Sequence, residues 1–221
     1  MAAGVMLYGT AAHAASPRER EVPPFQYTSN PARVAASARV IPLYVDADFS
    51  DYDRERIVAA FRQWNYVLNG FIRFDGRLLP ENASRSQIEQ IRYHGGWVVA
   101  RVDSTHPIAQ KGEGAHALAV TVTGGRNGGF VYVIADRLAG RDLTGVVMHE
   151  FGHVLGAGHD QSGLMAPVYN AVASRCIDYQ AVAMVAQAQR LSMRDLNWCE
   201  TPRYQPGYPQ PHQPRSALRG Q

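Results

Sequence analysis

The sequence is poor in lysine, in charge of either sign and in long apolar runs, and each shortage disfavours a class of protein. Lys111 is the only lysine, and 22 basic against 19 acidic residues leave a net charge of +3. No basic run is interleaved with aromatic residues, so the composition gives no reason to expect a nucleic-acid partner. The apolar stretches are too short to span a membrane, so we expect no transmembrane segment.

Internal repeats are missing too, and the 221 residues, 46% of them hydrophobic, are enough for one well-formed core. We assign residues 39–200 to a single domain. Residues 16–38 form a polar, proline-containing lead before it. Residues 201–221 are rich in proline and glutamine and cannot bury a core, so we expect them to form a disordered tail.

The first residues have the composition of an export signal. Residues 1–15 are small and apolar, and Ala12-His13-Ala14 is a cleavage signal of the A-x-A type. The charged start of a signal peptide is missing, so we interpret residues 1–15 as its remnant; the alternative is a disordered alanine-rich terminus. The first interpretation predicts a secreted or periplasmic protein.

Cysteine is scarce, with Cys176 and Cys199 as the only two. In an exported protein these two would pair and fix the last helical region. In a cytosolic protein they would be two buried thiols. The sequence alone leaves both interpretations open.

Strands and helices alternate along residues 39–200. The order β-α-β-β-β-β-α-α predicts an α/β fold in one unit. Pro42 indicates that the first strand lies at an edge of the sheet or that the proline stands early in the strand. Residues 76–94 look polar, with one helical turn. Ser192, with Asp195, is a further helix start signal. The predicted strands are 40–45, 71–74, 97–102, 117–123 and 130–135. The predicted helices run from Ser50 to Gly70, from Asp142 or Thr144 to Leu155, and from Asp178 to about Arg190.

The stretch HEFGHVLGAGH, residues 149–159, has the spacing of a metal site. His149 and His153 lie four residues apart, so on a helix they present two imidazoles on one face. Gly156 can end the helix and turn the chain sharply, which lets His159 return as a third ligand. Three protein ligands with one open position are typical of a catalytic zinc. We therefore predict one bound Zn²⁺.

Glu150 supplies the remaining chemistry of a hydrolase. It follows His149 directly, so its carboxylate lies beside the open position rather than on the metal. There it can take a proton from a zinc-bound water that attacks a carbonyl, and pass the proton to the leaving amine. The alternative is a helix with unrelated surface histidines.

The motif resembles the His-Glu-x-x-His-x-x-Gly-x-x-His signature of the metzincin zinc proteases, and GLMAP resembles their Met-turn. Among metzincins it is most similar to the matrixins, in which the Met-turn is followed by Pro-x-Tyr. The resemblance implies a metzincin-type catalytic domain with a five-stranded mixed sheet, an active-site helix and a small C-terminal subdomain. It implies that Met165 lies beneath the zinc without binding it, and that Pro167 and Tyr169 border the S1′ pocket. For Tyr169 the alternative is ordinary packing under the turn.

The same resemblance implies that residues 115–122 form the edge strand above the cleft, to which an extended substrate adds as a further strand. An ordinary hairpin strand is the alternative. The segment RLSMRDLNW, residues 190–198, resembles the start of the matrixin C-terminal helix.

The sequence departs from matrixins in several places. Asp160 follows the third histidine where matrixins typically have serine, and the link from His159 to Met165 is short. Residues 131–133, Val-Tyr-Val, stand where several ligands of the matrixin structural metals would lie, so we do not expect a structural zinc; calcium stays open. His94, His106 and His116 could form a second site, but ordinary surface histidines fit their loose spacing better.

The sequence thus predicts a zinc-dependent endopeptidase acting on proteins or peptides, with no prediction of oligomeric state. Two alternatives belong to other classes. One is a zinc-binding interaction protein with a catalytically silent site. The other is an adhesive or surface protein whose tail, residues 201–221, does the work. Neither explains why Glu150 accompanies three correctly spaced histidines.

Overall fold

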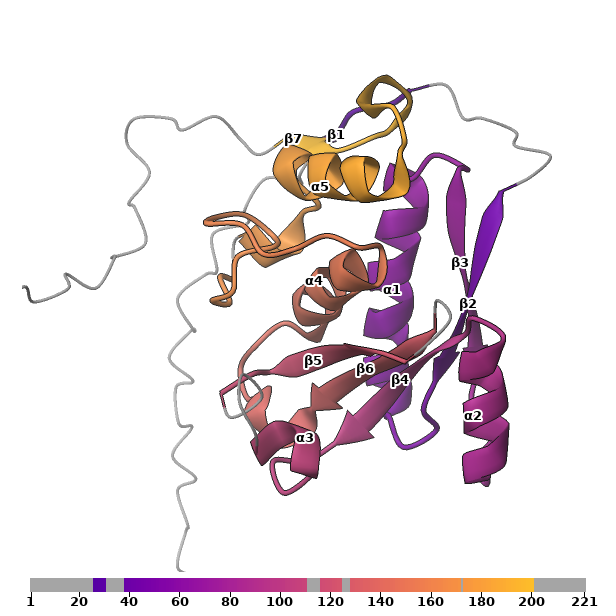
Figure 1. Cartoon of the computed structure of the whole chain (residues 1–221). Coiled ribbons are helices and arrows are strands. Elements are labelled where there is room, and N and C mark those ends of the chain that lie inside the picture. Colours follow the sequence, from indigo (N-terminus) through magenta and orange to yellow (C-terminus); the bar gives the residue numbers. More distant parts are fainter. Residues whose placement is uncertain (1–25, 31–37, 111–115, 125–127, 172, 201–221) are drawn as a thin grey trace, which may run out of the picture.

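The computed structural model describes residues 26–30, 38–110, 116–124, 128–171 and 173–200. Five strands form one mixed sheet in the order β3-β2-β4-β6-β5 (Figure 1). Neighbouring strands are parallel except for β5, which runs antiparallel to β6 at one edge. The predicted α/β fold with a five-stranded mixed sheet is therefore confirmed. The strands are β2 (Arg39–Val45), β3 (Ile72–Leu78), β4 (Trp97–Val102), β5 (Ala119–Thr123) and β6 (Gly129–Ile134).

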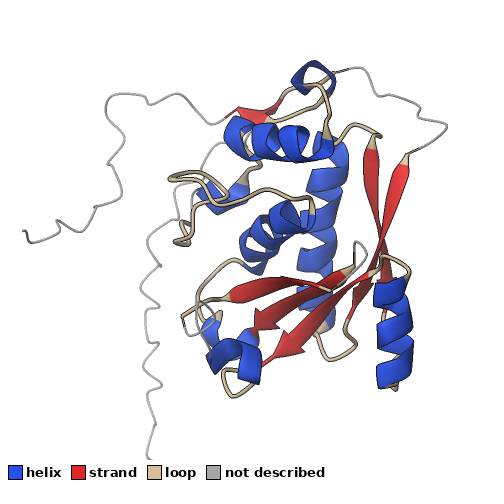
Figure 2. Cartoon of the chain, viewed as in Figure 1, coloured by secondary structure: helices blue, strands red, loops and turns tan. Residues whose placement is uncertain are grey.

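Helices cover both faces of this sheet (Figure 2). Helix α1 connects β2 to β3, its neighbour at one edge of the sheet. Helix α2 leads back in the opposite direction along the sheet, from β3 past β2 to β4. Because such crossovers are right-handed, they place α1 and α2 on opposite faces. Helix α4 packs on α1 and β5, on the α1 face. The main helices are α1 (Asp51–Val67), α2 (Arg85–Tyr93), α4 (Leu143–Val154) and α5 (Tyr179–Gln189), with a short α3 (Pro107–Gln110).

The core lies between the sheet and the α1–α4 pair. Alternate residues of the strands point into it, as the twofold repeat of a strand requires. Trp64 of α1 is fully buried, and its Nε1 donates to the Met148 carbonyl of α4 at 2.9 Å. The rings of Phe74 and Phe151 meet at 5.1 Å between centroids. Each large side chain buried here contributes about 1.5–3 kcal/mol, so α4 is held at a fixed place over the sheet.

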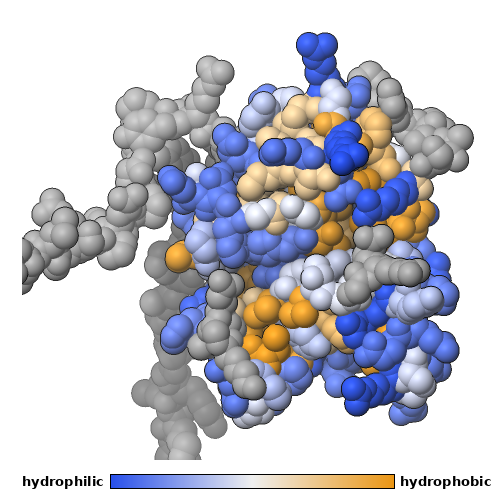
Figure 3. Space-filling model, in the orientation of Figure 1, coloured by the Kyte–Doolittle hydropathy of each residue, from blue (hydrophilic) through white to orange (hydrophobic). Residues whose placement is uncertain are grey.

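A small C-terminal region, with α5 at the top of the molecule in Figure 1, completes the fold. Here β7 (Cys199–Glu200) pairs antiparallel with β1 (Gln26–Tyr27). Cys176 and Cys199 form a disulfide, which agrees with the first of the two interpretations that the sequence left open. Weakly apolar residues lie over α5 in the upper part of the surface shown in Figure 3, and polar residues surround them.

Three elements differ from the sequence prediction. The polar segment expected to hold one turn contains the complete helix α2, which starts with a capping box at Ser84 and Gln87. None of its residues is fully buried, and its apolar repeat consists only of the half-buried Ile88 and Ile91. Strand β3 extends to Leu78 because its polar second half pairs with β2. The helix start at Ser192 gives only the 3-10 turn η4 (Met193–Asp195), because the chain beyond it extends into β7.

The predicted strand with Pro42 is an inner strand of the sheet. Strand β3 pairs with all of β2, whereas β4 pairs only with Leu43–Val45. Pro42 therefore lies in the part of β2 that has a neighbour on one side, where a missing N–H is tolerated. Segments 1–15 and 201–221 lie outside the described residues, as does most of 16–38. None of the helices in the described part of the chain combines the length and apolar character that a membrane crossing requires.

Candidate metal centre

Helix α4 carries the first two histidines of the motif. Its N-terminus is capped by Asp142, whose side chain accepts from the Thr144 amide. At the other end Gly156 adopts a φ of +88°, and the Gly156 and Ala157 amides donate to the carbonyls of His153 and Gly152. This is a Schellman motif, in which glycine allows the left-handed turn. It redirects the chain so that His159 returns to the same face of α4.

The three histidines converge through their Nε2 atoms. His153 Nε2 lies 3.0 Å from His149 Nε2 and 3.2 Å from His159 Nε2. Among the described residues they form the one group of three or more metal-ligating side chains, with all ligand atoms within 4.8 Å. The structure thus brings together the predicted ligand set.

The other ring nitrogens decide which atoms can bind a metal. His149 Nδ1 lies 2.7 Å from the Leu164 carbonyl, and His153 Nδ1 lies 2.9 Å from the Ala157 carbonyl. A carbonyl only accepts, so each Nδ1 carries the proton and each Nε2 presents a lone pair. Burial lowers the pKa of His149 to about 4, so that ring is neutral at physiological pH.

Two lone pairs 3.0 Å apart repel unless a cation lies between them. Zinc–nitrogen bonds of about 2.0–2.1 Å in tetrahedral geometry imply nitrogen separations of roughly 3.3 Å. The separations seen at His153 are close to that value. The donor set therefore fits zinc, and the backbone carbonyls at Leu164 and Ala157 orient its rings.

Glu150 lies beside the three histidines and is 6% exposed. Its Oε2 accepts from the Thr121 hydroxyl of β5 at 2.6 Å. Burial raises the pKa of the Glu150 carboxyl to about 7, although the bond from Thr121 acts in the opposite direction. A carboxyl group with a pKa near neutrality can both take up and release a proton there.

Met165 is fully buried against α4. A Cβ atom on Gly152 would lie 2.4 Å from Met165 Sδ. This glycine, between His149 and His153 in the sequence, therefore allows the sulfur to lie close to the backbone of α4. The short link to His159 is closed by the Asp160 amide, which donates to the Met165 carbonyl at 2.9 Å. The turn that carries Met165 is thereby fixed under the histidine cluster.

Comparison with known proteins agrees with this geometry. The family model described as Matrixin matches residues 44–185. The chain belongs to the matrixin family. Matrixins are zinc metalloproteases, so the cluster on α4 lies in the fold of a zinc-protease family. No curated protein matches the chain.

Among solved structures, the chain is similar to high choriolytic enzyme 1, a hatching-enzyme zinc protease from Oryzias latipes, the medaka fish. The identity is 24% and the TM-score 0.33, over 55% of this chain and 46% of the fish enzyme. The chain therefore spans less than half of that protein. The family assignment depends on the matrixin match alone.

In this matrixin, Pro167 and Tyr169 lie in the segment that follows Met165. Pro167 is exposed, whereas Tyr169 is half-buried and its hydroxyl accepts from the Asp142 amide at 2.9 Å. Tyr169 therefore ties the segment after the Met-turn to the start of α4. This bond of Tyr169 also fits the alternative of packing under the turn.

The other histidines of this matrixin do not form a second metal site with one another in the described structure. His94 ends α2, and His106 stacks on Tyr132 at 5.3 Å between ring centroids. A hollow of about 510 Å³ lies on the α1 side of α4, away from the histidine cluster. It is lined by Arg56, Gln63, Gly140, Arg141, Asp142, Thr144, Met148 and Arg175.

Sequence reasoning missed the residues that hold the cluster in place. Thr121 bonds to Glu150, and Asp178 accepts from the Leu164 amide at 2.7 Å. Asp178 was predicted only as the start of a helix. Alternation along β5 puts Thr121 on the same face of the sheet as Ala119 and Thr123. Nothing in the sequence of β5 indicates that this face meets Glu150.

Proposed function

We propose that this matrixin is a zinc-dependent endopeptidase that binds Zn²⁺ through His149, His153 and His159 and uses Glu150 as general base and acid. The observation that carries the proposal is the convergence of three Nε2 atoms next to a buried carboxyl group. Zinc bound there supplies Lewis-acid polarisation of the scissile carbonyl and lowers the pKa of an attacking water.

Glu150 handles the proton in this reaction. Its carboxylate accepts a proton from the water that adds to the peptide carbonyl carbon. It then delivers that proton to the amide nitrogen as the C–N bond breaks, which leaves a carboxylic acid and an amine. The Thr121 hydroxyl holds Oε2 in one position, so the other oxygen is left to face the substrate.

We propose that the substrate is a protein or peptide bound in extended form along β5. This strand lies at the edge of the sheet and is also the strand that contacts Glu150 through Thr121. An edge strand can pair its main chain with an added strand and so position a peptide bond beside the catalytic group. Pro167 and Tyr169 would border the pocket on the far side, with Met165 as the buried support beneath the metal.

We further propose that residues 39–200 are the catalytic domain and that the protein is secreted or periplasmic. The Cys176–Cys199 disulfide supports export because such bonds persist in oxidising compartments.

The proposal is tested with the parent protein and the variants Glu150→Ala and Glu150→Gln, each loaded with zinc and incubated with a proteome-derived peptide library. We expect both variants to bind one zinc per chain and to lose cleavage by at least about a hundredfold, as removal of a general base does. Cleavage by Glu150→Ala at the parent rate would overturn the mechanism.

The same experiment separates the zinc-binding interaction protein from the peptidase. If the zinc-loaded parent cleaves no peptide of the library, the catalytically silent alternative is favoured. Deletion of residues 201–221, followed by binding and localisation assays, tests the alternative in which the tail carries the function.

A further inference from the structure

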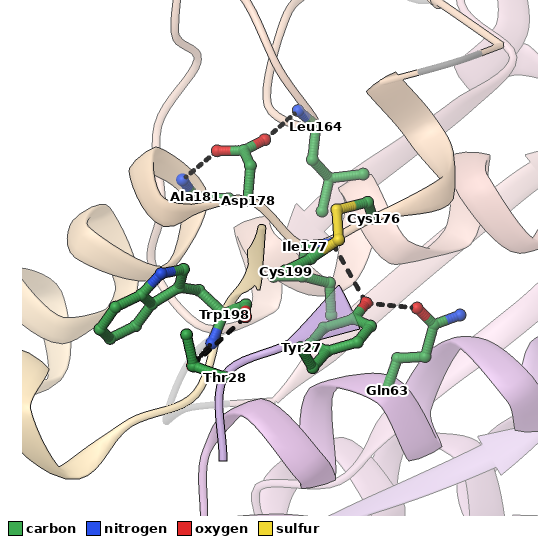
Figure 4. The surroundings of a disulfide bond; sticks show 10 residues. All are labelled: Tyr27, Thr28, Gln63, Leu164, Cys176, Ile177, Asp178, Ala181, Trp198 and Cys199. Atoms are coloured by element: carbon green, nitrogen blue, oxygen red, sulfur yellow. Dashed lines mark hydrogen bonds between the residues drawn. A yellow bond between two sulfur atoms is a disulfide. The ribbon is translucent and has the colours of Figure 1, made fainter. Parts of the chain in front are cut away.

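Asp178 follows Cys176 of the disulfide by two residues, and its carboxylate points to the backbone of Leu164 and Ala181 (Figure 4). Its Oδ2 accepts from the Leu164 amide at 2.7 Å, and its Oδ1 accepts from the Ala181 amide at 3.0 Å. The second bond caps the N-terminus of α5. The first reaches back into the turn beneath the histidines, which a helix cap does not require.

Leu164 is held at both of its backbone groups. Its N–H donates to Asp178, and its C=O accepts the Nδ1 proton of His149 at 2.7 Å. Leu164 itself is buried, and its two partners, His149 and Asp178, are half-buried. The position of the Asp178 carboxylate therefore sets where the Leu164 carbonyl lies, and that carbonyl orients the His149 ring.

The turn is shaped to admit the carboxylate. Gly163 has a φ of +76°, and a Cβ atom there would lie 2.4 Å from Asp178 Oδ2. Any other residue at this position would be strained and would push the carboxylate away from the Leu164 amide. The close approach of Asp178 thus depends on a glycine in the Met-turn itself.

The other side of Asp178 is anchored to the C-terminal strand. Cys176, two residues before it, is cross-linked to Cys199, and the Cys199 amide donates to the Ile177 carbonyl at 2.9 Å. Asp178 also forms a β-bridge with Cys199. The Tyr27 hydroxyl accepts from the Ile177 amide and donates to Gln63 of α1 (Figure 4). The backbone that carries the carboxylate is therefore fixed from both sides.

We propose that Asp178 is a positioning residue for His149, and that through it the Cys176–Cys199 cross-link stabilises the zinc-bound state. The proposal rests on the proposed function only in taking His149 as a zinc ligand. Besides capping α5, Asp178 connects the cross-linked C-terminal region to the metal centre through one residue, Leu164. Removal of the carboxylate, or of the cross-link, should therefore weaken zinc binding.

Two substitutions separate the capping bond from the bond to the turn. In Asp178→Ser the hydroxyl is a good N-cap for the Ala181 amide, but it is too short to accept from Leu164 as well. In Asp178→Ala both bonds are lost. The matched control is Ser84→Ala, which removes the cap of α2 on the opposite face of the sheet and leaves Leu164 untouched.

Zinc dissociation constants of the full chain are measured by competition with a chromophoric chelator, together with the visible spectrum of the cobalt-substituted protein and the thermal midpoint of the zinc-loaded form. We expect Asp178→Ser and Asp178→Ala to weaken zinc binding by a similar factor, about tenfold, as loss of an outer partner of a ligating histidine does. Their cobalt spectra should shift, because the His149 ring is free to rotate. Ser84→Ala should lower the thermal midpoint but keep the parent dissociation constant and spectrum.

The cross-link is tested in the same way with the paired substitution of Cys176 and Cys199 by serine, alone and combined with Asp178→Ser. If the cross-link acts through Asp178, the combined variant should bind zinc little more weakly than the Asp178→Ser variant or the variant without the cross-link. Additive losses would overturn the coupling. A parent-like dissociation constant and cobalt spectrum in both Asp178 variants would overturn the positioning role.

The outcome is independent of peptidase activity. If the library shows no cleavage, the proposed function fails while the zinc constants still decide the role of Asp178. If cleavage is found and Asp178→Ser binds zinc like the parent, the function stands and this inference fails.

Discussion

At the scale of single residues, His149 and Glu150 are neighbours whose pKa values are displaced in opposite directions. Burial lowers the pKa of His149 from 6.5 to about 4 and raises that of Glu150 from 4.5 to about 7. Between pH 4.5 and 6.5 the folded chain therefore keeps both groups neutral, whereas the unfolded chain ionises both. One proton is released and one is taken up on unfolding, so the two contributions to the pH dependence of stability cancel.

Removing either member should expose the contribution of the other. In Glu150→Gln, the unfolded state binds a proton at His149 below pH 6.5 that the folded state does not, so stability falls as the pH falls from 6.5 to 4. In His149→Gln, the folded state keeps a proton on Glu150 that the unfolded state releases, so stability falls as the pH rises from 4.5 to 7. Each slope should reach at most about 1.4 kcal/mol per pH unit relative to the parent.

Urea unfolding in excess chelator, at a series of pH values, measures these slopes. The double variant should return to the pH dependence of the parent, because it loses both displaced groups. Slopes of the same sign in the two single variants would contradict the assignment of a neutral histidine and a protonated glutamic acid.

The predictable part of the site is the part that lies close together in the sequence. Helical spacing places His149 and His153 on one face, and Gly156 ends the helix, so the ligand set follows from eleven consecutive residues. Thr121 is separated from Glu150 by 29 positions and Asp178 from Leu164 by 14. Their contacts depend on how β5 packs on α4 and how the start of α5 packs on the turn that carries Leu164, and no local pattern encodes that.

At the scale of elements, the packing of α4 on the Met-turn depends on glycine at position 152. A methyl group there would lie 2.4 Å from Met165 Sδ and 2.9 Å from its terminal carbon. We expect Gly152→Ala to lower the free energy of unfolding by about 1–3 kcal/mol, as overpacking of a core does. Chemical denaturation with zinc present measures this loss.

Gly158→Ala is the matched control for this prediction. It lies in the loop beyond the same helix, and a Cβ atom there would meet nothing within 4 Å. Its stability should stay within about 0.5 kcal/mol of the parent. Equal effects of the two substitutions would show that the approach of Met165 to α4 is not the cause.

The elements themselves were predictable where packing leaves a pattern. Buried strands such as β4 and the capped helices α1 and α4 follow from apolar repeats and start signals, and their observed ends lie close to the predicted ones. Helix α2 carried a capping signal, but its apolar repeat is limited to Ile88 and Ile91, and neither is fully buried. At η4 the sequence has a helix start signal at Ser192, but only a short turn forms. The chain after η4 is extended because it continues into β7, which pairs with β1 and carries Cys199 of the disulfide.

At the scale of the whole molecule, the proposed metal centre joins parts that are distant in the chain. Helix α4, the loop with His159, the Met-turn and the start of α5 all meet there, and α4 contacts α1 and β5. Zinc that binds only this folded arrangement stabilises every element at once, by RT ln(1 + [Zn²⁺]/Kd). At free zinc a thousandfold above Kd this amounts to about 4 kcal/mol.

We therefore expect removal of zinc by a chelator to lower the thermal midpoint of the parent by roughly 8–16 °C, since about 1 kcal/mol corresponds to 2–4 °C in a chain of this size. Glu150→Ala should show the same zinc-dependent shift, because in the proposed function Glu150 is a general base and not a zinc ligand. His153→Ala should lose the shift, because its Nε2 is central to the cluster, within 3.0 and 3.2 Å of the other two. His106→Ala, which removes a histidine stacked on Tyr132 instead, should keep it. An undiminished shift in His153→Ala would mean that zinc stabilises this fold from a site other than the one on α4.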